Sequence, residues 1–334
     1  MGVLSAPTSP QNIHVLNSVI LTVSILSALG AGWIILSFLL FKPLRSFRHQ
    51  LILGLATSDF WMAINFLSSS AVNLSGHNIG KPEMKTFCSF NGFSIQVFVV
   101  QTDYWVLTIA VCTYLILANH RHQSSWIQDH KAVVWGLPWF LSILWAAIGL
   151  GIVGYGDIGA WCWFTSDRIR LLVNFIPRWL IIVTILALYI RLYFIIHTAH
   201  NRFMSFDEDG IGSLQTGSSA MNMSSSAEED CERRGQVAPR NTRIGRASPV
   251  LKRVSYQMMT YPLVYMLIWT IPTTIRIYQA TTGKSAPFAI GTVDKSCIVI
   301  QGFADALVYG FNENTWLQWR GVFRRGNSGS DENK

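Results

Sequence analysis

Several ionisable side chains lie inside long apolar segments of the sequence, and four of them are the residues best placed to do chemistry. These four are Asp59, Asp103, Arg178 and Asp305. Charged groups in such segments are costly to bury and are functional-site candidates by default. Asp59 and Asp305 lie at similar depth, about 12 Å and about 9 Å from the ends of their segments on one side. Two carboxylates at one depth repel unless one is protonated or a cation lies between them, so we predict a polar switch.

Arg178 offers a second kind of chemistry, because it follows Pro177 and lies about 10 Å from the start of its segment. A guanidinium at this depth either faces a cavity and binds an anionic ligand, or pairs with Asp103, or extends its head outward to water. The residues that we expect to line a ligand cavity are Gln96, Gln101, Asp103, Trp163, Arg178 and Trp269.

Other familiar chemistries lack their residues. A retinal Schiff base needs a lysine deep in the last segment, whereas Lys295 lies only about 8 Å from the end of it. Intramembrane zinc catalysis needs clustered histidines, but all eight histidines fall at segment ends or in loops. We therefore expect no cofactor and no metal, and we expect that the chain is not an enzyme.

Seven apolar segments must position these side chains. Half of the residues are hydrophobic, only 13% are charged and the mean hydropathy is +0.32, which indicates lipid as the solvent. About 20 residues cross a bilayer as a helix. The predicted spans are 15–41, 51–74, 93–118, 132–153, 171–196, 254–275 and 290–311. The sequence therefore predicts an all-α membrane protein, a bundle of seven transmembrane helices.

The distribution of positive charge predicts the orientation of this bundle. Lys and Arg favour the cytoplasmic side of a membrane. With the N-terminus outside, the inner segments hold 18 Lys and Arg residues and the outer segments hold six. We predict the N-terminus outside and the C-terminus inside. The net charge of +8 does not indicate nucleic acid as a partner, because the basic residues lie between apolar runs and form no continuous patch.

Two regions outside the spans have a composition of their own. The loop between the fifth and sixth spans is rich in Ser, Gly and charge, so it cannot bury enough apolar surface to fold alone. After the last span, Trp316, Trp319 and Phe323 share one helical face, which predicts an amphipathic helix on the inner membrane surface. The predicted division is an extracellular N-terminus (1–14), helices 1–5 (15–196), a disordered cytoplasmic loop (197–253), helices 6–7 (254–311), and a cytoplasmic amphipathic helix and tail (312–334).

The tripeptide Trp161-Cys162-Trp163 lies in the loop between the fourth and fifth spans, outside the membrane in this orientation. Cys88 begins the third span on the same side. Because disulfides persist in an oxidising compartment, we favour a Cys88–Cys162 bond that holds the loop over the third helix. The alternatives are Cys297 as the partner, or two free thiols. The two tryptophans suit a membrane interface, since each has an apolar ring and one N–H donor.

Six segments in order resemble the cAMP-receptor-like G protein-coupled receptors, first known from slime moulds and common in fungi, and the chain is similar to a fungal member. They are "FCSFNGFSIQ" (87–96), "WGLP" (135–138), "GDIGAWCWF" (156–164), "NFIPRW" (174–179), "YPLVYMLIWTIPTTIRI" (261–277) and "QGFADALVYGFNE" (301–313). The resemblance implies a plasma-membrane receptor for an extracellular small molecule, which acts on a heterotrimeric Gα and feeds cAMP–protein kinase A signalling. It also implies the Cys88–Cys162 bond. It does not imply that cAMP is the ligand.

The chain departs from this family in the last span, where Asp305 replaces a usual asparagine. The DRY and NPxxY motifs of rhodopsin-like receptors are absent, and "NHRH" (119–122) and "LVYGFN" (307–312) stand in their places. We expect Tyr309 and Asn312 to join the polar switch. The residues expected to contact the G protein are Arg121, Arg246, Lys252 and Arg253.

A polytopic transporter or channel is the alternative function. Such proteins commonly show inverted repeats, helices interrupted at the midplane and a continuous polar path. We find no internal repeat in the sequence, and seven spans do not divide evenly. The receptor is therefore the favoured interpretation.

Overall fold

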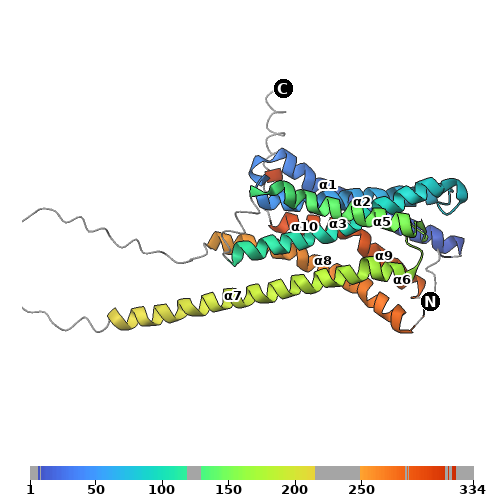
Figure 1. Ribbon diagram of the computed structural model, residues 1–334. Coiled ribbons are helices and arrows are strands. Elements are labelled where there is room, and N and C mark those ends of the chain that lie inside the picture. The colour runs from blue at the N-terminus through green and yellow to red at the C-terminus, as the bar shows by residue number, and fades with distance from the viewer. Residues whose placement is uncertain are drawn as a thin grey trace, which may run out of the picture.

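The computed structural model describes most of the chain and shows an elongated bundle of helices (Figure 1). The described residues are 7, 9–118, 129–214, 249–282, 284, 286–312, 315 and 318–320. Within them, every predicted span coincides with a helix. The long helices are α1 (Pro10–Leu40), α2 (Phe47–Leu74), α3 (Lys85–Leu117), α5 (Lys131–Ile152), α7 (Ile176–Leu214), α8 (Pro249–Thr282), and the pair α9 (Phe288–Val299) and α10 (Gln301–Asn312).

Short elements connect these helices. They are the 3₁₀ turns Lys42–Leu44 and Pro82–Met84, the strands β1 (Gly156–Asp157) and β2 (Cys162–Trp163), the helix α6 (Asp167–Arg170), and a π-helical turn, Leu171–Phe175. The pair α9 and α10 forms the seventh span, and the turn at Ile300 separates the two helices. The bundle of seven helices predicted from the apolar segments is confirmed.

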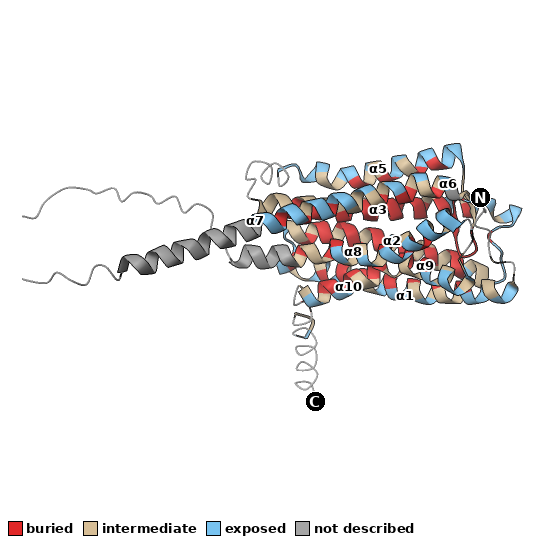
Figure 2. Cartoon of the chain, turned by 90° about the horizontal axis from the view of Figure 1, so that it is seen from below, coloured by how far each residue is buried: buried red, intermediate tan, exposed pale blue. Residues whose placement is uncertain are grey.

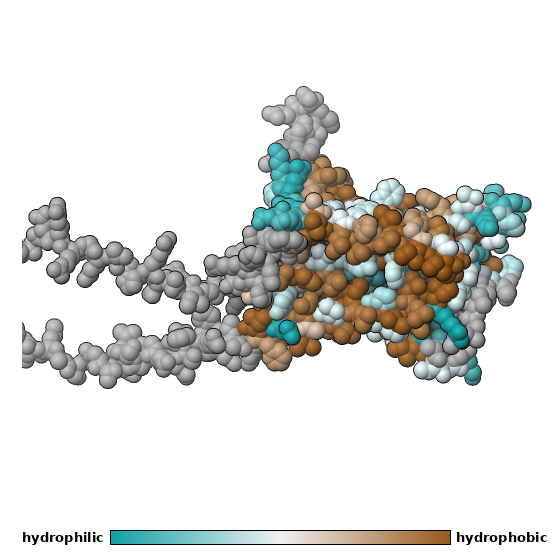
Figure 3. Space-filling model, in the orientation of Figure 1, coloured by the Kyte–Doolittle hydropathy of each residue, from teal (hydrophilic) through white to brown (hydrophobic). Residues whose placement is uncertain are grey.

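The helices bury one side and leave the other apolar side exposed, as expected in lipid. Within the described residues, five helical spans are long and apolar enough to cross a membrane: 10–40, 47–74, 82–117, 131–152 and 168–195. Buried residues face the axis of the bundle and exposed ones face outward (Figure 2). On the face in Figure 3, hydrophobic residues form a belt around the middle, and hydrophilic ones gather near both ends. A continuous apolar belt of this kind on the outside of a bundle indicates a surface that faces hydrocarbon.

The first helix shows how the sequence sets this pattern. Its buried residues recur at intervals of three or four, which places them on one helical face. They are Leu16, Asn17, Ile20, Ser24, Ser27, Ala31, Ile34 and Ser37. Small residues on such a face allow neighbouring helices to approach closely in a membrane. The Ser24 hydroxyl donates to the Ile20 carbonyl of its own helix, at 2.7 Å, so its burial leaves no free donor.

One end of the bundle carries a β-hairpin, and we call it the hairpin end. Strands β1 and β2 are antiparallel, with Gly156 opposite Trp163 and Asp157 opposite Cys162. The start of α1 lies at this end, because the Asn17 amide donates to the Gly159 carbonyl at 3.1 Å. The starts of α3 and α9 lie there as well, so these three helices and the hairpin form one polar cap.

The loop predicted at 197–253 is shorter than expected, because helices enter it from both sides. Helix α7 continues to Leu214, and α8 begins at Pro249. In Figure 1, α7 extends past the ends of its neighbours. The helix extends past the end of the apolar run near Ile196, because a helix can continue through polar residues without an apolar face. Residues 215–248 lie outside the described part of the chain.

The segment after α10 returns to the first helix. The Trp319 indole N–H donates to the Ser37 hydroxyl at 3.0 Å, and its ring packs edge-on against Phe41, with centroids 5.5 Å apart. Trp319 therefore contacts the end of α1. Trp316 and Phe323, the other two residues of the predicted amphipathic face, lie outside the described residues.

Candidate functional site

The disulfide between Cys88 and Cys162 is present, with the two Cα atoms 5.3 Å apart. It attaches β2 to the start of α3. Cys297 on α9, the alternative partner, is a free thiol and is half-buried. The bond favoured from the sequence is therefore confirmed, and it fixes the hairpin over the bundle.

The expectation that Trp161 and Trp163 anchor the hairpin at a membrane interface is wrong. The two side chains are only 1% and 3% exposed. The Trp161 ring meets Phe66 of α2 edge-on, with centroids 4.6 Å apart. The hairpin thus inserts both rings into the bundle. Burying two large rings contributes more than a contact with lipid headgroups would, since aromatic side chains dominate the energetics of cores.

A line of hydrogen bonds runs from the hairpin into the bundle. The Trp163 indole N–H donates to Gln96 Oε1 at 2.7 Å, and Gln96 Nε2 donates to Asn174 Oδ1 at 3.0 Å. All three side chains are buried. They come from β2, α3 and the π-helical turn, so this line joins three separate segments through neutral polar groups.

A buried ion pair lies deeper in the bundle. Arg178 Nε donates to Asp103 Oδ1 at 3.0 Å, and its Nη2 donates to Asp103 Oδ2 at 2.8 Å. The Tyr265 hydroxyl of α8 also donates to Asp103 Oδ1, at 2.5 Å. The guanidinium carbon lies 3.4 Å from the centroid of the Trp269 ring. Of the three alternatives for Arg178, the structure therefore shows the pair with Asp103.

The π-helical turn and Pro177 explain how α7 positions these groups. Pro177 has no N–H, so the carbonyl four residues earlier, at Val173, loses its helical donor. The Trp145 indole N–H of α5 donates to that carbonyl instead, at 2.9 Å. The wider turn of a π-helix shifts the register of the residues around it, and such turns are frequent at functional sites. Here it aims Asn174 and Arg178 into the bundle together.

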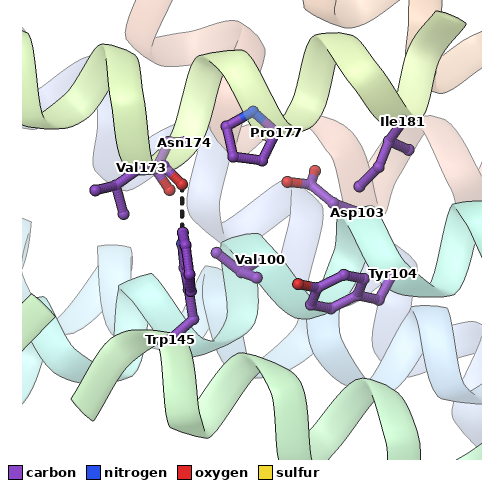
Figure 4. A pocket seen from close by; sticks show the side chains of 8 residues that line it. All are labelled: Val100, Asp103, Tyr104, Trp145, Val173, Asn174, Pro177 and Ile181. Atoms are coloured by element: carbon purple, nitrogen blue, oxygen red, sulfur yellow. Dashed lines mark hydrogen bonds between the residues drawn. The ribbon is translucent and has the colours of Figure 1, made fainter. Parts of the chain in front are cut away.

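A cavity of about 90 Å³ lies between α3, α5 and α7, beside the ion pair (Figure 4). Its lining residues are Val100, Asp103, Tyr104, Trp145, Val173, Asn174, Pro177 and Ile181. This volume is far below the roughly 300–1,000 Å³ of a typical ligand pocket. A ligand of ordinary size therefore does not fit in this cavity as it stands.

Gln101 stays apart from these networks. It is fully buried on α3, and neither its amide nitrogen nor its amide oxygen has a hydrogen-bond partner in the described part of the chain. A buried amide without partners costs free energy. The other five residues predicted for the cavity, Gln96, Asp103, Trp163, Arg178 and Trp269, are joined by the contacts given above.

The structure brings Asp59 of α2 and Asp305 of α10 together. Their side chains lie next to each other, and the Thr102 hydroxyl of α3 donates to Asp59 Oδ1 at 3.3 Å. Two adjacent carboxyl groups share a hydrogen bond only when one of them carries a proton. The cluster connects α2, α3 and α10, and its hydrogen bonding depends on protonation.

The remaining two residues of the predicted switch lie elsewhere. The Tyr309 ring packs edge-on against Trp33, with centroids 5.8 Å apart. Asn312 bonds to α8, because its Nδ2 donates to the Gln257 carbonyl at 3.1 Å and its own carbonyl accepts from Gln257 Nε2. Arg48 of α2 donates to Gln257 Oε1 at 3.0 Å. Asn312 thus joins α8 and α10 at the end opposite the hairpin.

The four residues predicted to contact a G protein are only partly described. Arg121 and Arg246 lie outside the described residues, whereas Lys252 and Arg253 lie in the first turns of α8. That position is at the end opposite the hairpin, close to Gln257. Their role in binding remains a prediction.

Sequence reasoning missed three residues, each of which completes a different network: Asn174 with Gln96, Tyr265 with Asp103, and Thr102 with Asp59. Tyr265 had a detectable signal, because Tyr261, Tyr265 and Trp269 follow one another at intervals of four and share one face of α8. All three are buried. Asn174 and Thr102 gave no such signal, because each is a single polar residue and its sequence does not show which side chain it meets.

The hairpin is also held by a side chain of α9. Lys295 Nζ of α9 donates to the Ile158 carbonyl at 3.0 Å and lies 5.7 Å from the centroid of the Trp161 ring. Burial raises the pKa of Asp157 in β1, while a hydrogen bond from the Gly159 N–H and the charge of Lys295 oppose that rise. The hairpin therefore forms part of the rigid cap of the bundle.

Comparisons with known proteins agree with this arrangement. Residues 11–203 match the family Git3, described as "G protein-coupled glucose receptor regulating Gpa2", and residues 246–318 match the C-terminal part of the same receptors. Squid rhodopsin is similar in structure, with a TM-score of 0.59, 14% identity, and coverage of 92% of this chain and 87% of that chain. At this identity the similarity concerns the fold alone.

Two relatives from Arthrobotrys oligospora match nearly the whole chain. "Ascaroside receptor GPR2" is 43% identical and covers 97% of this chain and 94% of its own length. "Ascaroside receptor GPR3" is 34% identical over 95% of this chain and 89% of its own length. "Cyclic AMP receptor-like protein A" of Dictyostelium discoideum is 25% identical over 59% of this chain and 50% of its own length.

Proposed function

The chain belongs to the Git3 family of G protein-coupled receptors, and from this premise we propose that its ligand is an ascaroside. Members of this family are multi-pass plasma-membrane receptors that sense an extracellular molecule and signal through a G protein. The observation that carries the proposal is the similarity to an ascaroside receptor along nearly the full length of both chains. A second full-length relative with the same ligand class supports it.

The chemistry below the hairpin is compatible with such a ligand. An ascaroside is a glycoside, so its sugar offers hydroxyl groups that both donate and accept hydrogen bonds. The line of Trp163, Gln96 and Asn174 consists of neutral donors and acceptors. The Trp269 ring, which packs against the Arg178 guanidinium, adds an aromatic surface. Buried polar groups of this kind discriminate strongly between ligands, because a ligand without the matching group leaves them unpaired.

We propose that the hairpin end faces the outside of the cell and that the N-terminus lies on that side. Two observations support this orientation. The segments that this orientation places inside hold three times as many Lys and Arg residues as the segments that it places outside. The Cys88–Cys162 disulfide, which persists in an oxidising compartment, lies at the end where α1 begins.

The mechanism is an equilibrium between two packings of the bundle. Helix α8 is the natural moving element, since it contains Pro262 and Pro272. Its polar contacts include Tyr265 with Asp103 near the middle, Gln257 with Asn312 at the inner end, and the ion pair of Arg276 with Asp294 of α9. A ligand that favours one packing at the hairpin end favours the same packing at the G protein end. A coupling of about 1–3 kcal/mol suffices.

The G protein contact follows from the same mechanism. The inner end of α8 carries Lys252 and Arg253, and we propose that they bind the Gα subunit with Arg121 and Arg246. The Gα subunit would then feed cAMP–protein kinase A signalling, as the resemblance to the cAMP-receptor-like receptors implies.

The test is nucleotide exchange on a purified Gα subunit by the full-length receptor in lipid nanodiscs. We expect ascarosides to accelerate exchange in a saturable manner, and cAMP to have no effect. A Gln96→Leu variant should lose the response because it interrupts the line from Trp163 to Asn174. The matched control is Gln50→Leu. Gln50 lies on α2 at the end of the bundle opposite the hairpin, so this variant should respond normally. Acceleration by glucose and not by ascarosides would instead support the ligand named in the family description.

A further inference from the structure

The end of α2 carries a glycosylation sequon, Asn73-Leu74-Ser75. Asparagine followed two residues later by serine or threonine is the sequence to which N-linked glycans are attached on cell-surface proteins. This sequon lies at the hairpin end, because Asn73 Nδ2 donates to the Gly159 carbonyl at 3.5 Å. In the orientation proposed above, that end faces outside. The sequon is therefore in the compartment where glycans are added, and its side chains determine whether it can accept one.

Both polar atoms of the Asn73 side chain bond to other segments of the chain. Its Nδ2 donates to Asn17 Oδ1 of α1 at 3.0 Å, and its Oδ1 accepts from the backbone N–H of Ile79 at 3.2 Å. A glycan would replace a hydrogen of this same nitrogen. The sugar would then lie beside Asn17, whose side chain is 0% exposed. The space that an attached sugar needs is occupied by α1.

The rest of the sequon has the wrong surroundings as well. A glycosylated asparagine lies in a surface loop, whereas Asn73 lies one residue before the end of a membrane-spanning helix. The Ser75 hydroxyl donates to the Val72 carbonyl at 2.8 Å and lies 3.2 Å from His77 Nδ1. Neither contact directs this hydroxyl to the Asn73 amide.

The Asn73 amide instead connects three parts of the cap. Asn17, which accepts from it, passes the contact on, since Asn17 Nδ2 donates to the Gly159 carbonyl of the hairpin at 3.1 Å. Ile79, which donates to it, is 1% exposed and packs against the disulfide of Cys88 and Cys162. Asn73 therefore holds α1, the hairpin and the residues that cover the disulfide on the end of α2.

We propose that the Asn73 amide is a structural bracket of the cap and that the sequon it begins carries no glycan. The bracket and the glycan compete for one nitrogen atom. A sugar on Nδ2 would remove a donor from the buried oxygen of Asn17, and a buried acceptor that loses its donor costs free energy. The proposal rests on the orientation proposed above, and the experiments separate the two.

The first test is digestion of the full-length receptor with an N-glycosidase after expression in a eukaryotic host that adds N-linked glycans. We expect no change in gel mobility for the wild-type chain. The variant Gly283→Asn creates a sequon with Lys284 and Ser285, in the segment that joins α8 to α9 at the hairpin end. It should carry a glycan that the enzyme removes.

The outcomes of this test distinguish the bracket from the orientation. A glycan on the wild-type chain that is lost in Ser75→Ala would overturn the proposal and support the orientation. A glycan that is lost in Ser224→Ala would overturn the orientation, and the proposal with it. Ser224 completes the sequon Asn222-Met223-Ser224, in the segment between α7 and α8, which the proposed orientation places inside the cell. Failure of Gly283→Asn to gain a glycan would have the same meaning.

The second test measures the bracket through the disulfide that it covers. The rate at which a mild reductant opens the Cys88–Cys162 bond is followed by thiol labelling, well below the unfolding temperature. We expect Asn73→Ala to be reduced about fivefold faster than wild type, the factor that one neutral hydrogen bond contributes. Ser75→Ala removes the sequon and keeps the amide, so its rate should equal that of wild type.

The matched control is Asn65→Ala on the same helix. The Asn65 side chain is also half-buried, but its Nδ2 donates within α2, to the Trp61 carbonyl at 2.8 Å. We expect a wild-type rate for this variant. Equal rates for Asn73→Ala and wild type, or an equal acceleration by Asn65→Ala, would overturn the bracket. Neither experiment needs an agonist or a G protein, and digestion of the wild-type chain needs no variant to fold.

Discussion

The Tyr265 hydroxyl of α8 and the Asp103 carboxylate of α3 form a hydrogen bond of 2.5 Å in the middle of the bundle. The same carboxylate holds Arg178 of α7. Three helices therefore converge on one buried charge, and the bond from Tyr265 is the part of this contact that a movement of α8 must break. This geometry makes Tyr265 a restraint on the resting packing.

Substituting Tyr265 by phenylalanine should raise activity without ligand. The change removes only the hydroxyl and leaves the pair of Arg178 and Asp103 in place. A bond to a charged group contributes about 1.5–3 kcal/mol, so basal nucleotide exchange on Gα should rise about tenfold or more. Tyr278→Phe, at an exposed position of the same helix, is the control and should behave like wild type. Wild-type basal exchange in Tyr265→Phe would show that the bond does not restrain α8.

Removing one member of the buried ion pair should destabilise the receptor strongly. Arg178→Ala leaves Asp103 charged and buried, which costs about 3–5 kcal/mol. Its thermal unfolding temperature in detergent should fall far more than that of Arg168→Ala, an exposed arginine nearby. The double variant Asp103→Asn with Arg178→Met removes both charges and should recover a large part of the loss. The single variants Asp103→Asn and Arg178→Met are measured alongside. If the loss in the double variant equals the sum of their two losses, the interpretation is contradicted.

Removing the disulfide should abolish the ligand response even in the protein that remains folded. Cys162→Ser frees the hairpin that carries Trp163, and the loss of a native disulfide costs about 2–5 kcal/mol. We expect a lower unfolding temperature and no ascaroside response from the protein that remains folded. Cys297→Ser changes a half-buried free thiol and serves as the control. A normal dose response in Cys162→Ser would separate the hairpin from ligand binding.

Substituting Asp305 by asparagine should change basal signalling more than surface expression. An amide donates to the Asp59 carboxylate directly, so the pair no longer needs a shared proton. The equilibrium between the two packings should shift, and basal exchange should change at equal surface level. Glu83→Gln, at an exposed position between α2 and α3, is the control. If Asp305→Asn signals like wild type at equal surface level, the pair of Asp59 and Asp305 does not control basal signalling.

A close approach of two helices should be sensitive to a single methyl group. A Cβ atom at Gly54 of α2 would lie 2.4 Å from the Trp105 ring of α3, whereas nothing lies within 4 Å of such an atom at Gly136 of α5. Overpacking of this kind costs about 1–3 kcal/mol. Gly54→Ala should therefore lower the unfolding temperature, and Gly136→Ala should not. An unchanged temperature in Gly54→Ala would show that the Trp105 ring moves freely.

The sequence was informative where one physical requirement dominates. Continuous apolar runs in lipid can only be helices, so the number and order of the spans were predictable, although α3, α7 and α8 extend well beyond their apolar runs. The Cys88–Cys162 bond followed from the compartment that the two residues share. The convergence of Asp59 and Asp305 followed from their equal depth.

The partners of the buried side chains were not predictable in the same way. Arg178 had three equally reasonable environments, and only the π-helical turn before Pro177 decides which one it meets. Nothing in residues 171–175 distinguishes this turn from an ordinary helix. Trp161 and Trp163 were assigned to the wrong place because an amphipathic ring suits a membrane interface and a buried polar contact equally well.

The hairpin has a practical consequence for work on this receptor. It holds α3 through Cys162, α1 through the Gly159 carbonyl and α9 through the Ile158 carbonyl. An epitope inserted within 156–164 would sever all three attachments together. The turn at Gly76 has a φ of +88° and open space around it, so an antibody tag placed there would report surface display while leaving the cap intact.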